Sequence, residues 1–244
     1  MLVAEGLTKL YGDRPAVQGL DFRLDTGQIL GLVGPNGAGK TTTLRCLAGI
    51  LPLSAGRVMI GDHDLKRDPL GAKRLLAFVP DEPSLFDYLT VEEHLRLTAR
   101  LYGIPDDADR RLRVLEQFAL VGKRGALAEE LSRGMKQKLT LACALLHEPR
   151  VLLMDEPLTG LDPVGIRQVK DLLSQRAREG GSILLSSHQL PLIGELCTGL
   201  LFMHRGRIVA SGSQADLARS FPDAADLEAI FLAVTAGDGE PASE

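Results

Sequence analysis

The hydrophobic pattern of the chain alternates between short apolar segments and longer stretches with helical spacing. Two segments are continuously apolar, residues 151–154 and 183–185, which is typical of strands covered on both faces of a parallel sheet. The intervening residues 164–179 have the pattern of a crossover helix, which parallel neighbours require. Apolar segments predict strands at residues 28–33, 57–60, 75–79, 151–154, 182–186 and 199–202. The pattern therefore predicts an α/β protein with a parallel-sheet core.

The segment near the N-terminus shows strict alternation instead. Polar Asp21 and Arg23 alternate with apolar Phe22 and Leu24, which is typical of an antiparallel strand with one face in solvent. We therefore expect an N-terminal antiparallel β subdomain beside the parallel core.

The middle of the chain, about residues 87–146, is predicted to be an inserted α-helical subdomain. Thr90 and Glu93 have the spacing of a capping box, and Gly103 supplies a stop. A second helical pattern covers about residues 106–120. Because these helices follow one another without an intervening strand, we expect them to pack together as an insert within one domain.

A third helix of this insert is expected to follow Leu131 and Ser132. Its spacing leaves Lys136, Gln137 and Lys138 on the side that faces solvent or a partner. The apolar positions expected to pack on the core are Met135, Leu139, Ala142 and Leu146.

The composition fits one globular domain. The chain has 244 residues, of which 45% are hydrophobic, and its formal net charge of −4 gives no general attraction to nucleic acid, so no nucleic-acid partner is expected. No apolar run approaches the roughly 20 residues that cross a bilayer, and no secretory signal is visible, so cytoplasmic residence is expected. We predict a single domain at residues 1–236 and a disordered tail at residues 237–244.

One segment carries the clearest candidate chemistry. The sequence GPNGAGKT lies between the predicted strand at residues 28–33 and a helical pattern at residues 42–48, which is the context of a phosphate-binding loop, or P-loop. Its backbone N–H groups would surround the β-phosphate, and the following helix adds the positive end of its dipole. Lys40 would contact the β- and γ-phosphates, and the Thr41 hydroxyl would bind Mg²⁺. The expected nucleotide-binding residues are Gly34, Pro35, Asn36, Gly37, Ala38, Gly39, Lys40, Thr41 and Thr42.

Polar residues at the ends of two other predicted strands complete this candidate site. Asp155 directly follows the apolar run at residues 151–154, where a P-loop protein needs a second Mg²⁺ ligand. Glu156 comes next and is the candidate base for an attacking water. His188 follows the strand at residues 182–186 and would reach the same edge of the sheet, where it could hold the γ-phosphate. Glu156 and His188 are therefore the candidate catalytic residues.

These segments together resemble the nucleotide-binding domain of the ATP-binding cassette (ABC) transporter family, from residue 1 to about residue 236. GPNGAGKTT resembles the family's Walker A loop, LSRGM the signature motif, VLLMDEP the Walker B motif, LTGLD the D-loop, and His188 the switch histidine. The resemblance implies the P-loop NTPase (RecA-like) fold, ATP hydrolysis, and ATP and Mg²⁺ as cofactors.

The resemblance assigns further residues to the nucleotide. Tyr11 stands where the family stacks an aromatic ring on adenine, and Asp162 belongs to the D-loop. The signature residues would contact ATP bound to an opposing subunit, so that two cassettes close around two nucleotides. The signature residues are Leu131, Ser132, Arg133, Gly134 and Met135. We therefore expect a homodimer or heterodimer of ATPase subunits.

Three residues depart from the pattern of the family. Arg133 and Met135 replace the usual Gly and Gln of the signature motif. Asp81 stands where the family typically has a glutamine that contacts Mg²⁺ and the attacking water. We expect Asp81 still to approach the metal, together with Thr41 and Asp155.

The resemblance also implies a partner in the membrane. Residues 81–91 and 226–232 are similar to cassette subunits of exporters whose membrane-spanning part is a separate chain. A separate transmembrane permease subunit is therefore expected, with export as the favoured direction. The chain would lie peripherally on the inner face of the cell membrane, and exposed Leu85, Phe86 and Tyr88 are the expected contacts with the permease.

Two other functions stay open at this point. Soluble cassette ATPases of DNA repair or translation resemble paired cassettes or carry long coiled-coil insertions, and neither feature occurs in the 244 residues. A regulatory module that binds nucleotide without turnover is compatible with Arg133 and Asp81. The motifs do not identify the transported molecule.

Overall fold

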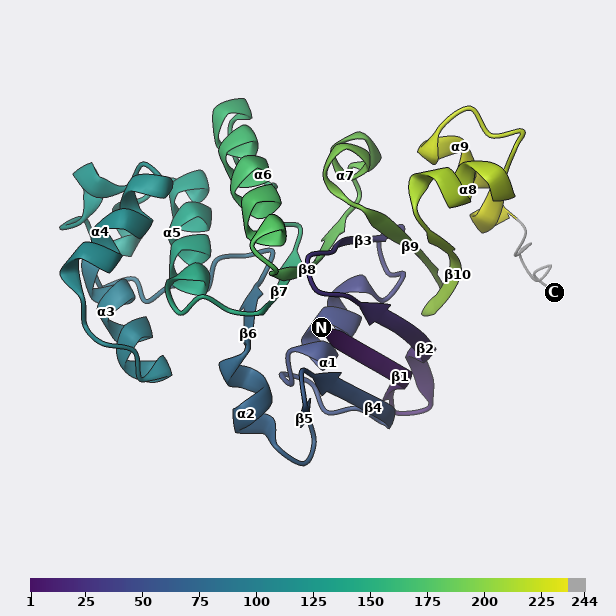
Figure 1. Cartoon of the computed structure of the whole chain (residues 1–244), viewed down its shortest axis with the longest axis horizontal. Helices are drawn as coiled ribbons and strands as arrows, with labels where there is room; N and C mark the ends of the chain where they lie inside the picture. Colours follow the sequence, from purple (N-terminus) through teal and green to yellow (C-terminus); the bar gives the residue numbers. More distant parts are fainter. Residues whose placement is uncertain (237–244) are drawn as a thin grey trace.

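The computed structural model describes residues 1–236, and the tail predicted at residues 237–244 lies outside them. The described chain has a central six-stranded sheet in the order β10-β9-β3-β8-β7-β6 (Figure 1). Its strands are parallel except β10, which pairs antiparallel with β9. The predicted parallel core is therefore confirmed. These strands are β3 (Ile29–Val33), β6 (Leu76–Val79), β7 (Val151–Asp155), β8 (Ser182–Ser187), β9 (Gly199–His204) and β10 (Arg207–Gly212).

The central sheet is covered on both faces, which explains why its middle strands are continuously apolar. Strands β3, β7 and β8 are buried at every residue. Successive side chains of a strand point to opposite faces. In β7, Leu152 and Met154 enter a core shared with most of the helices, whereas Val151 and Leu153 enter a core shared with α1 (Lys40–Leu47). One hydrophobic core on each face therefore holds the sheet.

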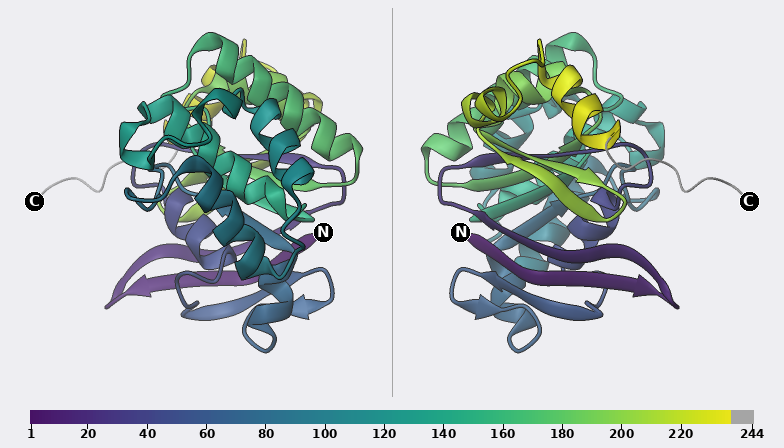
Figure 2. Two further views of the ribbon diagram at one scale, coloured as in Figure 1. Left: turned by 90° about the vertical axis from the view of Figure 1, so that its left-hand side faces the viewer. Right: turned by 90° about the vertical axis from the view of Figure 1, so that its right-hand side faces the viewer.

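A second sheet is antiparallel and packs on the α1 side of the molecule, as the N-terminal alternation predicts. Its order is β2-β1-β4-β5. Figure 2 shows it as a separate layer below the central sheet. The strand predicted at residues 57–60 belongs to this sheet. Its strands are β1 (Leu2–Tyr11), β2 (Arg14–Leu24), β4 (Ala55–Ile60) and β5 (His63–Asp64).

The helical region between β6 and β7 lies apart from the antiparallel sheet (Figure 1). Its α-helices, all within the described residues, are α3 (Val91–Tyr102), α4 (Ala108–Gln117) and α5 (Arg133–Leu146). Thr90 and Glu93 form the predicted capping box of α3. Glu92 accepts hydrogen bonds from Arg111 at 2.6 Å and from Arg124 at 3.0 Å, which ties α3 to α4 and to the chain beyond it. The helices are confirmed, while the extent of an insert at residues 87–146 stays a prediction.

One surface position predicted for α5 is wrong. Gln137 is buried, and its Nε2 donates a hydrogen bond to the carbonyl oxygen of Pro157 at 3.2 Å. The segment that follows β7 packs on this side of α5, and a local helical pattern does not report such a contact. Among the apolar positions, Leu139, Ala142 and Leu146 are buried, as expected.

The remaining helices connect the strands and cover the central sheet. The crossover predicted between β7 and β8 is α6, which Asp162 caps by accepting a hydrogen bond from the Gly165 N–H at 2.9 Å. None of the helices in residues 1–236 combines the length and the apolar character that crossing a membrane requires. These helices are α2 (Pro69–Arg74), α6 (Pro163–Arg178), α7 (Leu190–Leu196), α8 (Gln214–Ser220) and α9 (Leu227–Ala236).

The burial of β7 on both faces leads to a test of the core. Leu153 is fully buried, so Leu153→Ala should leave a cavity and lower the free energy of unfolding by about 2–5 kcal/mol. Leu70 on α2 is 73% exposed, and Leu70→Ala should change that free energy by no more than about 0.5 kcal/mol. Urea denaturation measures both variants. Equally small losses would show that β7 is not tightly packed.

Candidate functional site

The P-loop connects β3 to α1, and its surroundings require glycine at two positions. A Cβ atom on Gly34 would lie 2.4 Å from the carbonyl oxygen of Met203 in β9. Gly39 precedes α1 with a φ of 103°, and its Cβ would lie 2.6 Å from the carbonyl oxygen of Ala16 in β2. The loop therefore packs too closely on β9 and β2 to carry side chains there, which fixes its path into the helix.

Lys40, the first residue of α1, is held against the loop. It is only 8% exposed, and its Nζ donates hydrogen bonds to the carbonyl oxygens of Gly34 at 2.7 Å and Pro35 at 3.2 Å. Burial lowers the pKa of Lys40, and the carboxylates of Glu156 and Asp155 act in the opposite direction. An anion in the loop would offer this ammonium group a stronger partner than two neutral carbonyl groups.

A cavity of about 250 Å³ lies beside the P-loop. It brings together the predicted phosphate-binding residues, apart from Gly34, with carboxylates that follow β6 and end β7. The lining residues are Ala16, Pro35, Asn36, Gly37, Ala38, Gly39, Lys40, Thr41, Thr42, Asp81, Asp155 and Glu156. The contact between the P-loop and the carboxyl ends of these strands follows from the parallel pairing of the sheet.

Ser186 positions the two adjacent carboxylates. Its hydroxyl donates a hydrogen bond to Asp155 Oδ1 at 2.6 Å, and its Oγ accepts one from the backbone N–H of Glu156 at 3.0 Å. Ser186 and Asp155 are paired across β8 and β7. The sequence identified Ser186 only as the end of a strand, because its contacts depend on the register between two strands.

Glu156 and His188 face each other at this edge of the sheet. His188 Nδ1 lies 3.0 Å from Glu156 Oε1, with the imidazole exposed and the carboxylate mostly buried. Glu156 has a φ of 46°, in the left-handed region that residues with a side chain rarely adopt. Strained backbone of this kind tends to occur at functional sites, so the conformation supports a chemical role for this residue.

The carboxylates of the cavity fit a divalent cation. Asp81 has a buried Oδ1 that no hydrogen bond satisfies within the described chain. A buried carboxylate oxygen normally requires a donor or a cation. Mg²⁺ commonly takes one or two carboxylates and completes its coordination with water and phosphate oxygens. Asp81, Asp155 and Thr41 could therefore hold it, although residues 1–236 contain no cluster of three Asp, Glu, His or Cys arranged for a metal.

The signature segment lies outside the cavity beside the P-loop. Ser132 caps α5, because its Oγ accepts a hydrogen bond from the Met135 N–H at 3.3 Å. A Cβ on Gly134 would lie 2.9 Å from the carbonyl oxygen of Gly160, so the start of α5 packs closely on the segment before α6. Arg133 is exposed, and its side chain runs against Gly160. None of the signature residues lines the cavity beside the P-loop of their own chain.

Tyr11 is also separate from the cavity. It ends β1 as an exposed side chain, and Lys9 Nζ lies 5.4 Å from the centre of its ring. Tyr11 does not line the cavity beside the P-loop. Its predicted contact with adenine stays a prediction.

Comparison with known proteins decides the family. The model of the family described as "ABC transporter" matches residues 17–159, more than half of the chain. The chain belongs to the ABC transporter family. This ABC ATPase is 34% identical over 242 residues to the ABC-type transporter ATP-binding protein EcsA of Bacillus subtilis, with 98% of each protein covered. It is 33% identical over 219 residues to the linearmycin resistance ATP-binding protein LnrL of the same species, covering 89% of this chain and 70% of that protein.

Solved structures agree with the family and the fold. The ATP-binding subunit of an ABC transporter superimposes with a TM-score of 0.90 at 32% identity, covering 96% of this chain and 99% of that one. A nucleotide-free ATP-binding cassette from an ABC transporter superimposes with a TM-score of 0.78 at 23% identity, covering 94% of this chain and 98% of that one. At this identity the match supports only the fold. The predicted P-loop NTPase fold is therefore confirmed, and the ABC ATPase is an ATP-binding subunit of transporter type.

Two glycines of the loop provide a matched test of its packing. Gly37 has a φ of 79°, and a Cβ there would meet no atom within 4 Å. Gly37→Ala should therefore lower the free energy of unfolding by about 1–2 kcal/mol, which is the cost of placing alanine in the left-handed region. Gly39→Ala adds a collision with Ala16, so it should lower the free energy of unfolding further and weaken ATP binding. Chemical denaturation and nucleotide titration measure both effects. Identical losses would mean that the contact with Ala16 does not constrain the loop.

Proposed function

We propose that this ABC ATPase hydrolyses ATP as one of two cassettes that close around two Mg-ATP molecules, and thereby drives export by a separate transmembrane subunit. The observation that carries the proposal is the meeting of Lys40, Asp155 and Glu156 in one cavity. Transfer of a phosphoryl group to water needs a cation for the phosphates, a carboxylate for the metal and a residue that holds the water. Lys40 would supply the cation, Asp155 the carboxylate for the metal, and Glu156 the residue that holds the water.

In the proposed reaction, Glu156 holds the attacking water and accepts its proton. The bond from its backbone N–H to Ser186 fixes the start of the side chain, and His188 orients the carboxylate from 3.0 Å away. His188 is exposed, so it is also free to contact the γ-phosphate. Lys40 would exchange the two loop carbonyls for phosphate oxygens, which stabilises the negative charge that accumulates during transfer.

The proposed metal ligands are Thr41, Asp155 and Asp81. Mg²⁺, when bound, neutralises charge on the phosphate oxygens. The hydrogen bond from Ser186 leaves the second oxygen of Asp155 available, and the unsatisfied Oδ1 of Asp81 is a further oxygen ligand. A carboxylate at position 81 would bind the cation more strongly than the amide usual in the family.

The second half of each ATP site is proposed to come from the other cassette. Ser132 and Gly134 place a hydroxyl and free N–H groups at the start of α5. The N-terminus of a helix binds anions through such groups. None of the signature residues lines the cavity of its own chain. A cassette with 22% identity and a TM-score of 0.80 is described as dimeric with bound ADP and Pi, which supports pairing. Either a homodimer or a heterodimer satisfies this geometry.

The transmembrane partner is proposed to contact the helical region from the inner face of the membrane. Phe86 and Tyr88 are 61% and 82% exposed. Phe86 lines a groove of about 300 Å³ between β6, α3 and α5. Leu85 is only partly exposed and packs on the core, so it contributes less to that surface than the sequence predicts. A relative that is 38% identical over 219 residues is the Nod factor export ATP-binding protein I of Ralstonia nicotianae, which supports export.

The assignment of Glu156 is tested by Glu156→Gln. The amide cannot accept the water proton, so kcat for ATP hydrolysis should fall by about 10²- to 10⁴-fold, while ATP binding persists. The variant should also accumulate as a nucleotide-bound pair of cassettes, detectable by light scattering. A phosphate-release assay measures kcat for wild type and Glu156→Gln, and an equilibrium titration measures the affinity of each for ATP.

Glu148→Gln is a matched control for this variant. Glu148 has a φ of 54°, close to that of Glu156, but it is exposed and forms an ion pair with Arg110. Its activity should stay at the wild-type level. Equal and negligible phosphate release by wild type and Glu156→Gln would instead indicate a nucleotide-dependent switch without turnover.

The role of Asp81 is tested by the Mg²⁺ dependence of the ATPase rate. In Asp81→Asn, an amide replaces a carboxylate, so the Mg²⁺ concentration for half-maximal rate should rise about tenfold. Glu82→Gln, next along the chain and exposed, should keep the wild-type dependence. Coincident curves for Asp81→Asn and wild type would remove Asp81 from the metal site.

A further inference from the structure

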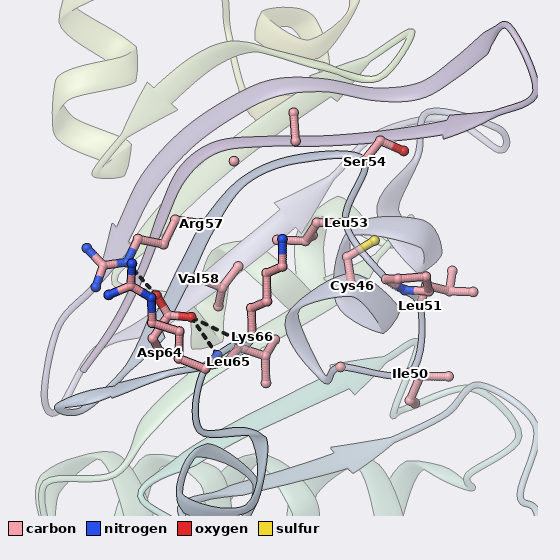
Figure 3. Close-up of a pocket in the computed structure, with 15 residues that line it drawn as sticks. Cys46, Ile50, Leu51, Leu53, Ser54, Arg57, Val58, Asp64, Leu65 and Lys66 are labelled. Carbon is pink, nitrogen blue, oxygen red and sulfur yellow. Dashed lines mark hydrogen bonds and ion pairs between the residues drawn. The ribbon is translucent and has the colours of Figure 1, made fainter.

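A second cavity, of about 830 Å³, lies away from the nucleotide site (Figure 3). It is open to solvent and is bordered by β4, β5 and the loop at residues 49–54, which follows α1. None of its lining residues also lines the cavity beside the P-loop. Its volume falls within the roughly 300–1,000 Å³ typical of small-molecule sites. The proposed ATPase mechanism makes no use of this cavity.

One wall of this cavity is apolar. Val58 and Leu65 are buried beneath it, and the loop adds Ile50, Leu51 and Leu53. Ile50 is 54% exposed, and Leu51 and Leu53 are only partly covered. A ligand with an aliphatic chain would remove this apolar surface from water, which is favourable by about 25 cal/mol per Å².

Helix α1 adds an uncharged group, Cys46, to the lining of the cavity. Cys46 on α1 is buried there, and burial raises the pKa of its thiol to about 11, so the group stays neutral at physiological pH. Figure 3 shows the Lys66 side chain extending between Val58 and Cys46. The Lys66 ammonium group therefore enters the cavity beside largely apolar surroundings.

Positive charge is in excess around the cavity. Arg57, Lys66 and Arg67 face a single carboxylate, Asp64. Asp64 accepts hydrogen bonds from Arg57 Nε at 2.7 Å and from the backbone N–H groups of Lys66 at 2.9 Å and Arg67 at 3.1 Å, and these bonds lower its pKa. No ion pair within residues 1–236 involves the side chain of Lys66 or Arg67. This excess stands out in a chain whose formal net charge is −4.

We propose that this cavity binds a free amphiphilic anion, a medium-length aliphatic chain that ends in a carboxylate. The aliphatic part lies against Val58, Leu65 and the apolar side chains of the loop. The carboxylate lies at the Lys66 ammonium group, which extends into the cavity between Val58 and Cys46 and which Asp64 does not neutralise. Apolar walls with a few convergent polar groups are the usual composition of a small-molecule site.

Calorimetric titration of the full-length protein with decanoate, below its micelle concentration and without nucleotide, tests the proposal. Decanoate should bind at one site, and Lys66→Glu should weaken it by about ten- to a hundredfold, as expected for the loss of a charged contact and the gain of repulsion. Lys123→Glu makes the same charge change at an exposed position on the helical region and should leave the affinity unchanged. Ile50→Ser should weaken binding while keeping every charge.

Three results would overturn the proposal. The first is equal decanoate affinity in Lys66→Glu and Lys123→Glu. The second is binding of uncharged decanol, or of short-chain butyrate, as tight as that of decanoate. The third is adsorption to phosphatidylglycerol vesicles without binding of free decanoate, which would indicate a membrane-contacting face. Because the titration contains no nucleotide, its outcome is independent of the assignment of Glu156.

Discussion

The candidate site depends on the register of three parallel strands. Val33 at the end of β3 pairs with Ser187 of β8, and Ser186 pairs with Asp155 of β7. This register brings the P-loop, the two adjacent carboxylates and the segment of His188 to one edge of the sheet. Because side chains alternate with a period of two, a shift of one residue in β7 would turn Asp155 to the opposite face and exchange the side chains of the two cores. The hydrophobic cores on both faces oppose that shift, so the packing of the interior holds the chemical groups at the edge.

Features that depend on neighbours in the chain could be predicted from the sequence. The apolar run at residues 151–154, the capping box at Thr90 and the glycine-rich loop are of this kind, and the structure contains each of them. The burial of Gln137 could not be predicted, because its partner Pro157 lies 20 residues away and meets it only after folding. The contacts of Ser186 require the pairing of β8 with β7. The second cavity, between β4, β5 and the loop at residues 49–54, is built from several elements, and no sequence motif marks it.

The helix that carries the signature segment is tied to the segment that follows Glu156. Gln137 donates to the carbonyl oxygen of Pro157, directly after Glu156, and Gly134 lies close to the backbone of Gly160. Both contacts are made to backbone atoms of the segment after Glu156. A side-chain rotamer change in that segment therefore cannot relieve them. A displacement of α5 would therefore act on the chain next to Glu156, and a partner docked on the helical region has a short route to the candidate catalytic residue.

The backbone of Glu156 has a consequence for how this protein can be stabilised. Its φ of 46° costs a residue with a side chain about 1–2 kcal/mol, and glycine would adopt the same backbone freely. A search for more heat-resistant variants that considered folding alone would thus favour glycine at this position, and it would delete the carboxylate beside His188. If Glu156 acts on the attacking water as proposed, durability and turnover make opposite demands on this one residue.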